Sequence, residues 1–133
     1  MLRIEHIGIA VRNLEVANQL FSALLATKVY KTEEVTTEQV KTSFLKTGET
    51  KIELLEATSE TSVIAKFLEK KGEGIHHIAF EVENIEESMQ HLESQGFILL
   101  NQKPKKGADN KWVCFLHPKS THGVLIELCQ EIS

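Results

Sequence analysis

The alternation of apolar and polar residues along the chain predicts a regular order of strands and helices. Residues 3–11 alternate as a strand does, with bulky aliphatic side chains on one face and His6, Gly8 and Ala10 on the other. Asn13 is a suitable N-cap for a helix, whose apolar positions recur at helical spacing at Leu14, Ala17, Leu20, Phe21, Leu24 and Leu25. Three strands are then predicted, at about 28–35, 39–47 and 50–57.

The rest of the chain repeats this order after a linking helix. That helix is predicted over 62–70 and ends at Gly72. A strand at 75–83 and a helix from Asn84 to about Gln95 follow, with Gly96 as the helix stop, and further strands are predicted near 97–101, 111–117 and 123–130. We therefore expect an α+β fold in which two tandem βαβββ modules form a curved mixed sheet around a cleft. We expect a single domain over 1–133, with module one at 1–58, the linking helix at 59–73 and module two at 74–133.

The two modules are also similar in sequence. Residues 4–14 return at 75–85 with an offset of 71, which places His6 over His77. Residues 52–54 return at 126–128 with an offset of 74, which places Glu53 over Glu127. Two histidines and two glutamates at equivalent places in two halves are the pattern that a metal site on a pseudo-twofold axis would produce.

Strand alternation predicts that these four side chains line one cavity. In each module the bulky row of the first strand is best placed against a helix, so His6 and His77 face the cleft, where Gly8 and Ala10 leave room. A buried carboxylate is costly unless it is paired, and a divalent metal such as Zn, Co, Ni, Mn or Fe would pair with both glutamates. For any one of the four residues alone, a hydrogen-bonded core histidine or a solvated glutamate is the simpler interpretation. The symmetric set favours a metal.

The remaining histidines and the cysteines fit roles other than metal ligation better: His117 and His122 suit a loop or ligand-contact role, and the others a structural or surface one. His76 points to the face opposite His77, His91 lies on an exposed helix face, and His117 and His122 flank a turn. None of them has a counterpart in the first module. The two cysteines, Cys114 and Cys129, lack metal-binding or redox spacing and are predicted to be small buried residues in a reduced compartment, the cytoplasm.

The charge of the chain excludes some classes of partner. A formal net charge of -4 gives no general reason to bind nucleic acid or an anionic membrane. No apolar run approaches the roughly 18 residues of a membrane span, and we expect no secretory signal. Lysines gather in one stretch, for which a solvated loop is the simplest interpretation; they are Lys103, Lys105, Lys106, Lys111 and Lys119.

Three segments resemble the vicinal oxygen chelate superfamily, which includes glyoxalase I, extradiol dioxygenases and methylmalonyl-CoA epimerases. They are HIGIAV at 6–11, TKIELLEATSETSVIAKFLEKKGEGIHHIAFEV at 50–82 and FLHPKSTHGVLIEL at 115–128. The last two most resemble the methylmalonyl-CoA epimerase family. The resemblance implies that His6, His77 and Glu127 are metal ligands, and that Glu53 stands at a fourth ligand position where family members have Gln or Glu.

The resemblance also implies a reaction. A metal-dependent epimerase of this kind interconverts (2R)- and (2S)-methylmalonyl-CoA, and its divalent ion (Co, Zn, Mn or Ni) stabilises the enolate that forms when the α-proton leaves. Glu127 is the one carboxylate that we assign to catalysis, because some members carry a second base where this chain has Thr42. The resemblance further implies an acyl-CoA substrate, for whose phosphates Lys119 is a candidate contact, and a homodimer.

Two other functions use the same pattern. A glyoxalase I-type lactoylglutathione lyase would use the same four ligands to enolise a glutathione hemithioacetal. A non-catalytic small-molecule-binding member of the superfamily would leave the four residues incidental. Metal content and the choice of substrate would separate the three.

Overall fold

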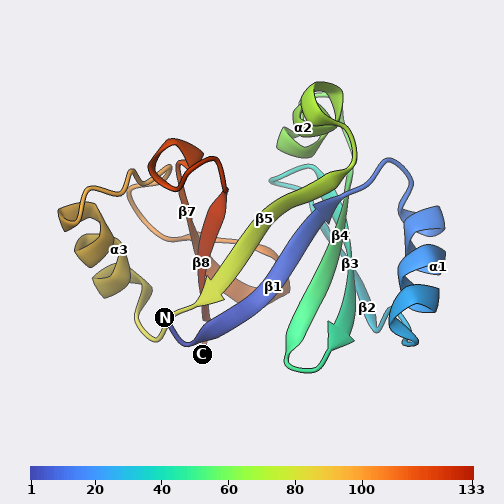
Figure 1. Ribbon diagram of the computed structural model, residues 1–133, viewed down its shortest axis with the longest axis horizontal. Coiled ribbons are helices and arrows are strands. Elements are labelled where there is room, and N and C mark those ends of the chain that lie inside the picture. The colour runs from blue at the N-terminus through green and yellow to red at the C-terminus, as the bar shows by residue number, and fades with distance from the viewer. The chain divides into compact units, whose positions relative to one another are not determined.

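The structure, a computed structural model that describes residues 1–133, divides into two compact units (Figure 1). The N-terminal unit comprises His6–His76, and the C-terminal unit comprises Met1–Glu5 together with His77–Ser133. Each unit contains one βαβββ module, so the predicted α+β class and the repeated order of elements are confirmed. No helix is long and apolar enough to cross a membrane.

The sheet of the N-terminal unit has the strand order β2-β3-β4-β1. Strand β1 runs parallel to β4, and the other neighbours are antiparallel. The elements are β1 (Arg3–Ala10, which enters this unit at His6), α1 (Leu14–Leu25), β2 (Lys31–Val35), β3 (Val40–Thr47), β4 (Thr50–Ala57) and α2 (Val63–Lys71). These bounds match the predicted ones closely, except that β2 starts three residues later than predicted.

The two helices of this unit pack on opposite faces of its sheet. The Asn13 side chain caps α1 by accepting a hydrogen bond from the Val16 N–H, as predicted. On the α1 face, Leu14 and Ala17 pack with Leu45 of β3, with Leu54 of β4 and with Val11, which directly follows β1. On the other face, α2 packs on the end of β1, where Ala10 joins a cluster of Val40, Leu55, Ile64 and Leu68. The expectation that Ala10 leaves open room above the sheet was therefore wrong, because the linking helix fills that space.

The sheet of the C-terminal unit has the order β5-β8-β7-β6. Strand β5 runs parallel to β8, and β7 is antiparallel to both β8 and β6. The elements are β5 (Gly74–Glu81, which enters this unit at His77), α3 (Ile85–Ser94), β6 (Lys105–Lys106), β7 (Lys111–Leu116) and β8 (Ile126–Glu131), with short 3₁₀ turns at Ala108–Asn110 and Pro118–Ser120. Asn84 caps α3 as Asn13 caps α1, and the helix covers the cluster of Val82, Ile85, Met89, Leu99, Cys114, Leu116 and Leu128.

One predicted strand does not form as a continuous element. Residues 97–101 make only a single bridge, between Leu99 and Leu116, and pairing with β7 resumes at β6. The Asn101 side chain interrupts the ladder, because its Oδ1 accepts the Phe115 N–H at 3.0 Å and its Nδ2 donates to the Val113 carbonyl at 3.2 Å. Hydrogen bonds of one side chain have therefore replaced the backbone pairing that the apolar pattern alone suggested.

Candidate metal centre

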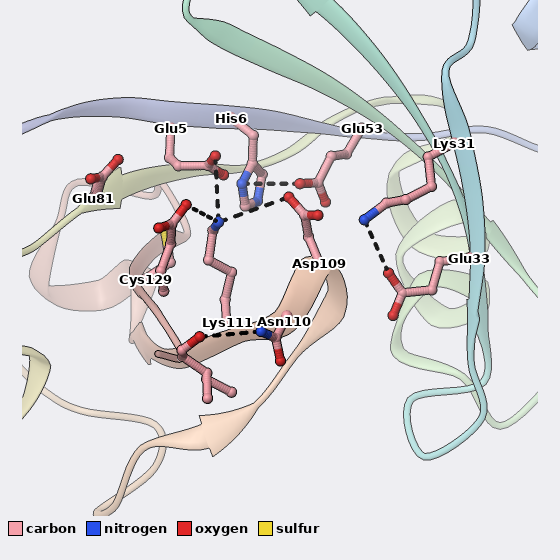
Figure 2. Close-up of polar contacts among 12 residues, drawn as sticks. Glu5, His6, Lys31, Glu33, Glu53, Glu81, Asp109, Asn110, Lys111 and Cys129 are labelled. Atoms are coloured by element: carbon pink, nitrogen blue, oxygen red, sulfur yellow. Dashed lines mark hydrogen bonds and ion pairs between the residues drawn. The ribbon is translucent and has the colours of Figure 1, made fainter.

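The first histidine–glutamate pair is built by two parallel strands of the N-terminal unit. In the register of β1 and β4, Glu53 lies opposite Gly8, and His6 precedes Gly8 by two residues, on the same face of the strand. Because Gly8 has no side chain, the carboxylate of Glu53 can cross over it, and His6 Nδ1 lies 3.1 Å from Glu53 Oε2 (Figure 2). Both residues are buried.

The second pair repeats this construction in the C-terminal unit. Strands β5 and β8 are also parallel, and Glu127 lies opposite Ala79, two residues after His77. His77 Nε2 lies 3.2 Å from Glu127 Oε1, and both residues are again buried. A small residue opposite the glutamate is therefore common to the two pairs, and strand alternation correctly predicted that each histidine shares a face with its glutamate.

A phenylalanine borders each glutamate on its other side. In the antiparallel registers, Phe44 lies opposite Glu53 and Phe115 lies opposite Glu127. The ring centroids of His77 and Phe115 lie 5.7 Å apart, and the two rings meet edge to face. Each carboxylate thus lies between an aromatic ring and a residue of little or no side chain, so water has limited access, and charges interact more strongly there than in solvent.

The spacing of each pair fits two ligands of one cation. Two donor atoms about 2.1 Å from a divalent metal lie roughly 3.0 Å apart in octahedral geometry and roughly 3.4 Å apart in tetrahedral geometry. The observed separations, 3.1 Å and 3.2 Å, lie within that interval. Imidazole nitrogen and carboxylate oxygen are also ligands that Zn, Co, Ni, Mn and Fe accept. Each unit therefore holds one half-site of suitable chemistry.

The other candidate residues lie as follows. Thr42 is buried on β3, on the face that carries Glu53, and its hydroxyl cannot act as a general base at neutral pH. Lys119 is exposed in the 3₁₀ turn, where its backbone N–H donates to His117 Nδ1 at 3.0 Å. His76 packs edge-on against Phe67 at 5.0 Å, so the prediction that it is structural is supported by an aromatic contact.

Lys111 is a buried residue that sequence reasoning placed wrongly. Its side chain is 6% exposed, and Nζ lies 4.0 Å from Glu5 Oε2 and 3.9 Å from Asp109 Oδ2 (Figure 2). Nζ also lies 3.5 Å from Glu131 Oε1. The other lysines of its stretch are exposed, as expected of a solvated loop; these are Lys103, Lys105, Lys106 and Lys119. The missed signal is strand alternation, because Lys111 shares parity with the inward-facing Val113 and Phe115.

Neither cysteine forms a disulfide, and both are buried, as predicted. Cys114 belongs to the cluster under α3, whereas Cys129 packs with Ala79 and Val113 on the opposite face. Burial raises the pKa of the Cys114 thiol to about 11, so the group stays protonated at neutral pH. A protonated thiol is a poor nucleophile and a poor metal ligand, which supports the structural role.

Comparisons with known proteins identify the family of the chain. Residues 5–115 match the model of the Glyoxalase/Bleomycin resistance protein/Dioxygenase superfamily. Ethylmalonyl-CoA/methylmalonyl-CoA epimerase of Cereibacter sphaeroides is 42% identical over 96% of this chain and 97% of its own. Mitochondrial methylmalonyl-CoA epimerase of Homo sapiens is 40% identical over 96% of this chain and 73% of its own.

Solved structures give the same result. A crystal structure of methylmalonyl-CoA epimerase from Mycobacterium tuberculosis is 33% identical with a TM-score of 0.94, covering 98% of this chain and 89% of that one. A structure described as methylmalonyl-CoA epimerase in complex with methylmalonyl-CoA and NH4+ is 34% identical with a TM-score of 0.93, covering 100% of this chain and 96% of that one. These similarities, which span nearly the whole of this chain, show that the chain belongs to the methylmalonyl-CoA epimerase family of the glyoxalase/bleomycin resistance protein/dioxygenase superfamily.

Proposed function

We propose that this protein is a metal-dependent epimerase that interconverts (2R)- and (2S)-methylmalonyl-CoA by removing and returning the proton on the α-carbon. The observation that carries the proposal is the buried histidine–glutamate pair, built twice in the same strand register. The substrate follows from the relatives, which are named for methylmalonyl-CoA and, in one case, also for ethylmalonyl-CoA.

The two half-sites together would hold one divalent cation through His6, Glu53, His77 and Glu127. When bound, a cation with open coordination positions supplies Lewis-acid stabilisation to negative charge on a thioester oxygen. Burial is important for this role, because carboxylates away from water keep a strong attraction for the cation. Co, Zn, Mn and Ni all accept this donor set.

The chain's own residues then move the proton. The α-proton of a thioester is weakly acidic, so its removal needs a base within hydrogen-bond reach. Glu127 is the residue that we assign, because it is a buried carboxylate beside the small Ala79, with Phe115 restricting water on the other side. Epimerisation also needs a group on the other face of the α-carbon. Thr42 offers no carboxylate there, so that second group remains unassigned.

The CoA portion of the substrate would meet basic residues on the C-terminal unit. Lys119 is exposed in the turn between β7 and β8, the strand that carries Glu127, and an ammonium group pairs well with a phosphate. Removal of this charge in a Lys119→Ala variant should raise KM for the CoA ester several-fold and leave kcat nearly unchanged. Lys103→Ala serves as a control and should leave KM unchanged.

The two buried cysteines form no disulfide, which is compatible with the proposal that the protein is cytoplasmic.

Proton NMR of methylmalonyl-CoA in D₂O tests the reaction directly. Metal-loaded protein should remove the α-proton signal by exchange with solvent, and chelation of the metal should stop the exchange. A His77→Ala variant should lose exchange, while His91→Ala, which changes an exposed histidine on α3, should retain it.

Two outcomes would contradict the proposal. Fully metallated, folded protein that exchanges no α-proton would exclude epimerisation of this ester, and turnover of methylglyoxal with glutathione by the same sample would then favour the glyoxalase I-type lyase. A protein that binds no metal but still binds small molecules would belong with the non-catalytic members.

A further inference from the structure

A row of residues leads across the sheet of the N-terminal unit from Glu53 to the edge strand β2. In the registers of β4, β3 and β2, Glu53 lies opposite Phe44, and Phe44 lies opposite Lys31. Residues directly opposite one another in a ladder share a face of the sheet, so Lys31 lies on the face that carries the candidate ligand. The exposure of β2 agrees with this direction. Lys31 and Glu33 are half-buried, whereas Thr32 between them is exposed.

The ammonium group of Lys31 is held over the ring of Phe44. Nζ lies 4.5 Å from the ring centroid, within the range of a cation–π interaction, and Phe44 is fully buried. Nζ also lies 3.8 Å from Glu33 Oε1, and the side chain of Lys31 is 38% exposed. In Figure 2 the ammonium end of Lys31 points to the side on which Glu53 lies. The aromatic ring and the carboxylate thus keep a positive charge in a fixed place at the edge of the half-site.

These contacts suit an ammonium group that binds an anion. A lysine ammonium has three N–H donors, and an aromatic ring face accepts hydrogen bonds only weakly. The 3.8 Å to Glu33 is also longer than the roughly 2.7–2.9 Å of a hydrogen-bonded ion pair. The carboxylate of a bound molecule can therefore approach Nζ more closely than Glu33 does, while Phe44 still supports the charge from below.

The proposed reaction brings such an anion to the site. A methylmalonyl ester carries a carboxylate on its α-carbon, and removal of the α-proton adds a second negative charge. A divalent cation and the carboxylates of Glu53 and Glu127 are neutral together, so they do not balance both charges of the substrate. A further positive charge stabilises the bound ester, and it stabilises the enolate more strongly.

We infer that Lys31 binds the carboxylate of the malonyl group and makes the site selective for acyl-CoA esters that carry a carboxylate on the α-carbon. This assignment rests on the proposed function, because it places the acyl group at the metal centre. The carboxylate is attached to the carbon that loses its proton, so an ion pair with Lys31 also fixes the direction of the α-proton. Lys31 is therefore a specificity and positioning residue, and the proton itself still goes to Glu127.

The second module has a similar lysine that is held less firmly. Lys105 Nζ lies 5.7 Å from the ring centroid of Phe115, compared with 4.5 Å for Lys31 and Phe44. Lys105 lies opposite Val113 instead of the phenylalanine, and it is exposed on the two-residue strand β6. Water therefore screens the charge of Lys105 more strongly than that of Lys31. For this reason we assign the carboxylate to Lys31.

Equilibrium binding of two CoA esters tests the assignment. Malonyl-CoA and acetyl-CoA differ only in the carboxylate, so their comparison cancels the contribution of the CoA portion. In isothermal titration calorimetry with metal-loaded protein, Lys31→Met should weaken malonyl-CoA binding about 10- to 100-fold and acetyl-CoA binding less than about twofold. Lys31→Arg keeps the charge and should recover most of the malonyl-CoA affinity. The matched control is Lys41→Met, which removes an exposed lysine from the other face of the same two strands and should change neither affinity.

Three results would overturn the inference. They are an unaltered protein that binds both esters equally, a Lys31→Met variant that weakens both esters alike or neither, and a difference between the esters that depends on Lys105 instead. Far-ultraviolet circular dichroism should show that Lys31→Met remains folded, since the lysine is partly exposed on an edge strand. Because the readout is binding, a protein that selects malonyl-CoA through Lys31 but exchanges no α-proton would contradict the proposed epimerisation and support this inference.

Discussion

The two modules agree at the candidate metal ligands and at their nearest neighbours, and they diverge four residues further along the same strands. In both, the glutamate lies between a small residue on one neighbouring strand and a phenylalanine on the other. Further along the strands, Val40 lies opposite Ala57 in the first module, and the equivalent residues in the second are Lys111 and Glu131. The first position is covered by α2. At the second, the buried Lys111 forms an ionic cluster with the buried Glu5, with Asp109 and with the exposed Glu131. The two modules therefore share the strand register that pairs each histidine with its glutamate, and they differ in the residues farther from the pair.

The largest expected difference between the modules concerns the two glutamates. Glu127→Gln should reduce α-proton exchange by about 10²–10⁴-fold, because an amide cannot accept the proton. Glu53→Gln should reduce it far less, because family members place either Gln or Glu at that position and an amide oxygen can still serve as a ligand. Exchange rates in D₂O with saturating metal give the comparison. Equal losses in both variants would mean that the glutamates act alike and that the base lies elsewhere.

The ionic cluster should make the second module more sensitive to mutation. Lys111→Ala leaves Glu5, which is 1% exposed, without this buried cation, so unfolding should become easier by about 3–5 kcal/mol. The equivalent Val40→Ala removes two methyl groups from an apolar cluster and should cost about 2 kcal/mol. Urea unfolding followed by circular dichroism measures both values. The exposed Lys103→Ala should change stability by less than about 0.5 kcal/mol and controls for loss of one positive charge.

Most of the fold could be predicted from the sequence, because the spacing of apolar residues and the positions of the capping residues indicate the same helix boundaries. Strand alternation identified the faces of His6 and His77, and helical spacing identified α1 and its cap. Helical spacing could not reveal that Leu20 lies outside the core. The spacing shows which residues of a helix are apolar, but it does not show which of them the rest of the protein buries. The apolar pattern also missed the interruption at Asn101, because whether a side-chain amide replaces a backbone bond depends on residues distant in sequence, here Val113 and Phe115.

The proposed metal site predicts that an added divalent metal stabilises the protein equally through His6 and through His77. At a free metal concentration of 100 times the dissociation constant, a ligand that binds only the folded state adds about 2.7 kcal/mol. His6→Ala and His77→Ala should each lose most of this increment, since each removes one imidazole from a shared site. Thermal unfolding with and without added Zn or Co measures the effect independently of catalysis. Loss of the increment in one variant alone would show that a single half-site holds the metal.

The smallest expected effect concerns the N-caps of α1 and α3, at which the two modules should respond alike to mutation. Asn13 Oδ1 accepts the Val16 N–H at 3.0 Å, and Asn84 Oδ1 accepts the Glu87 N–H at 3.1 Å, so each asparagine satisfies one N–H that the first turn of a helix leaves unpaired. Asn13→Ala and Asn84→Ala should therefore each cost about 1 kcal/mol in urea unfolding. A clearly larger loss for either variant would contradict this expectation and would show that the first turn of that helix depends on its asparagine for more than the one hydrogen bond.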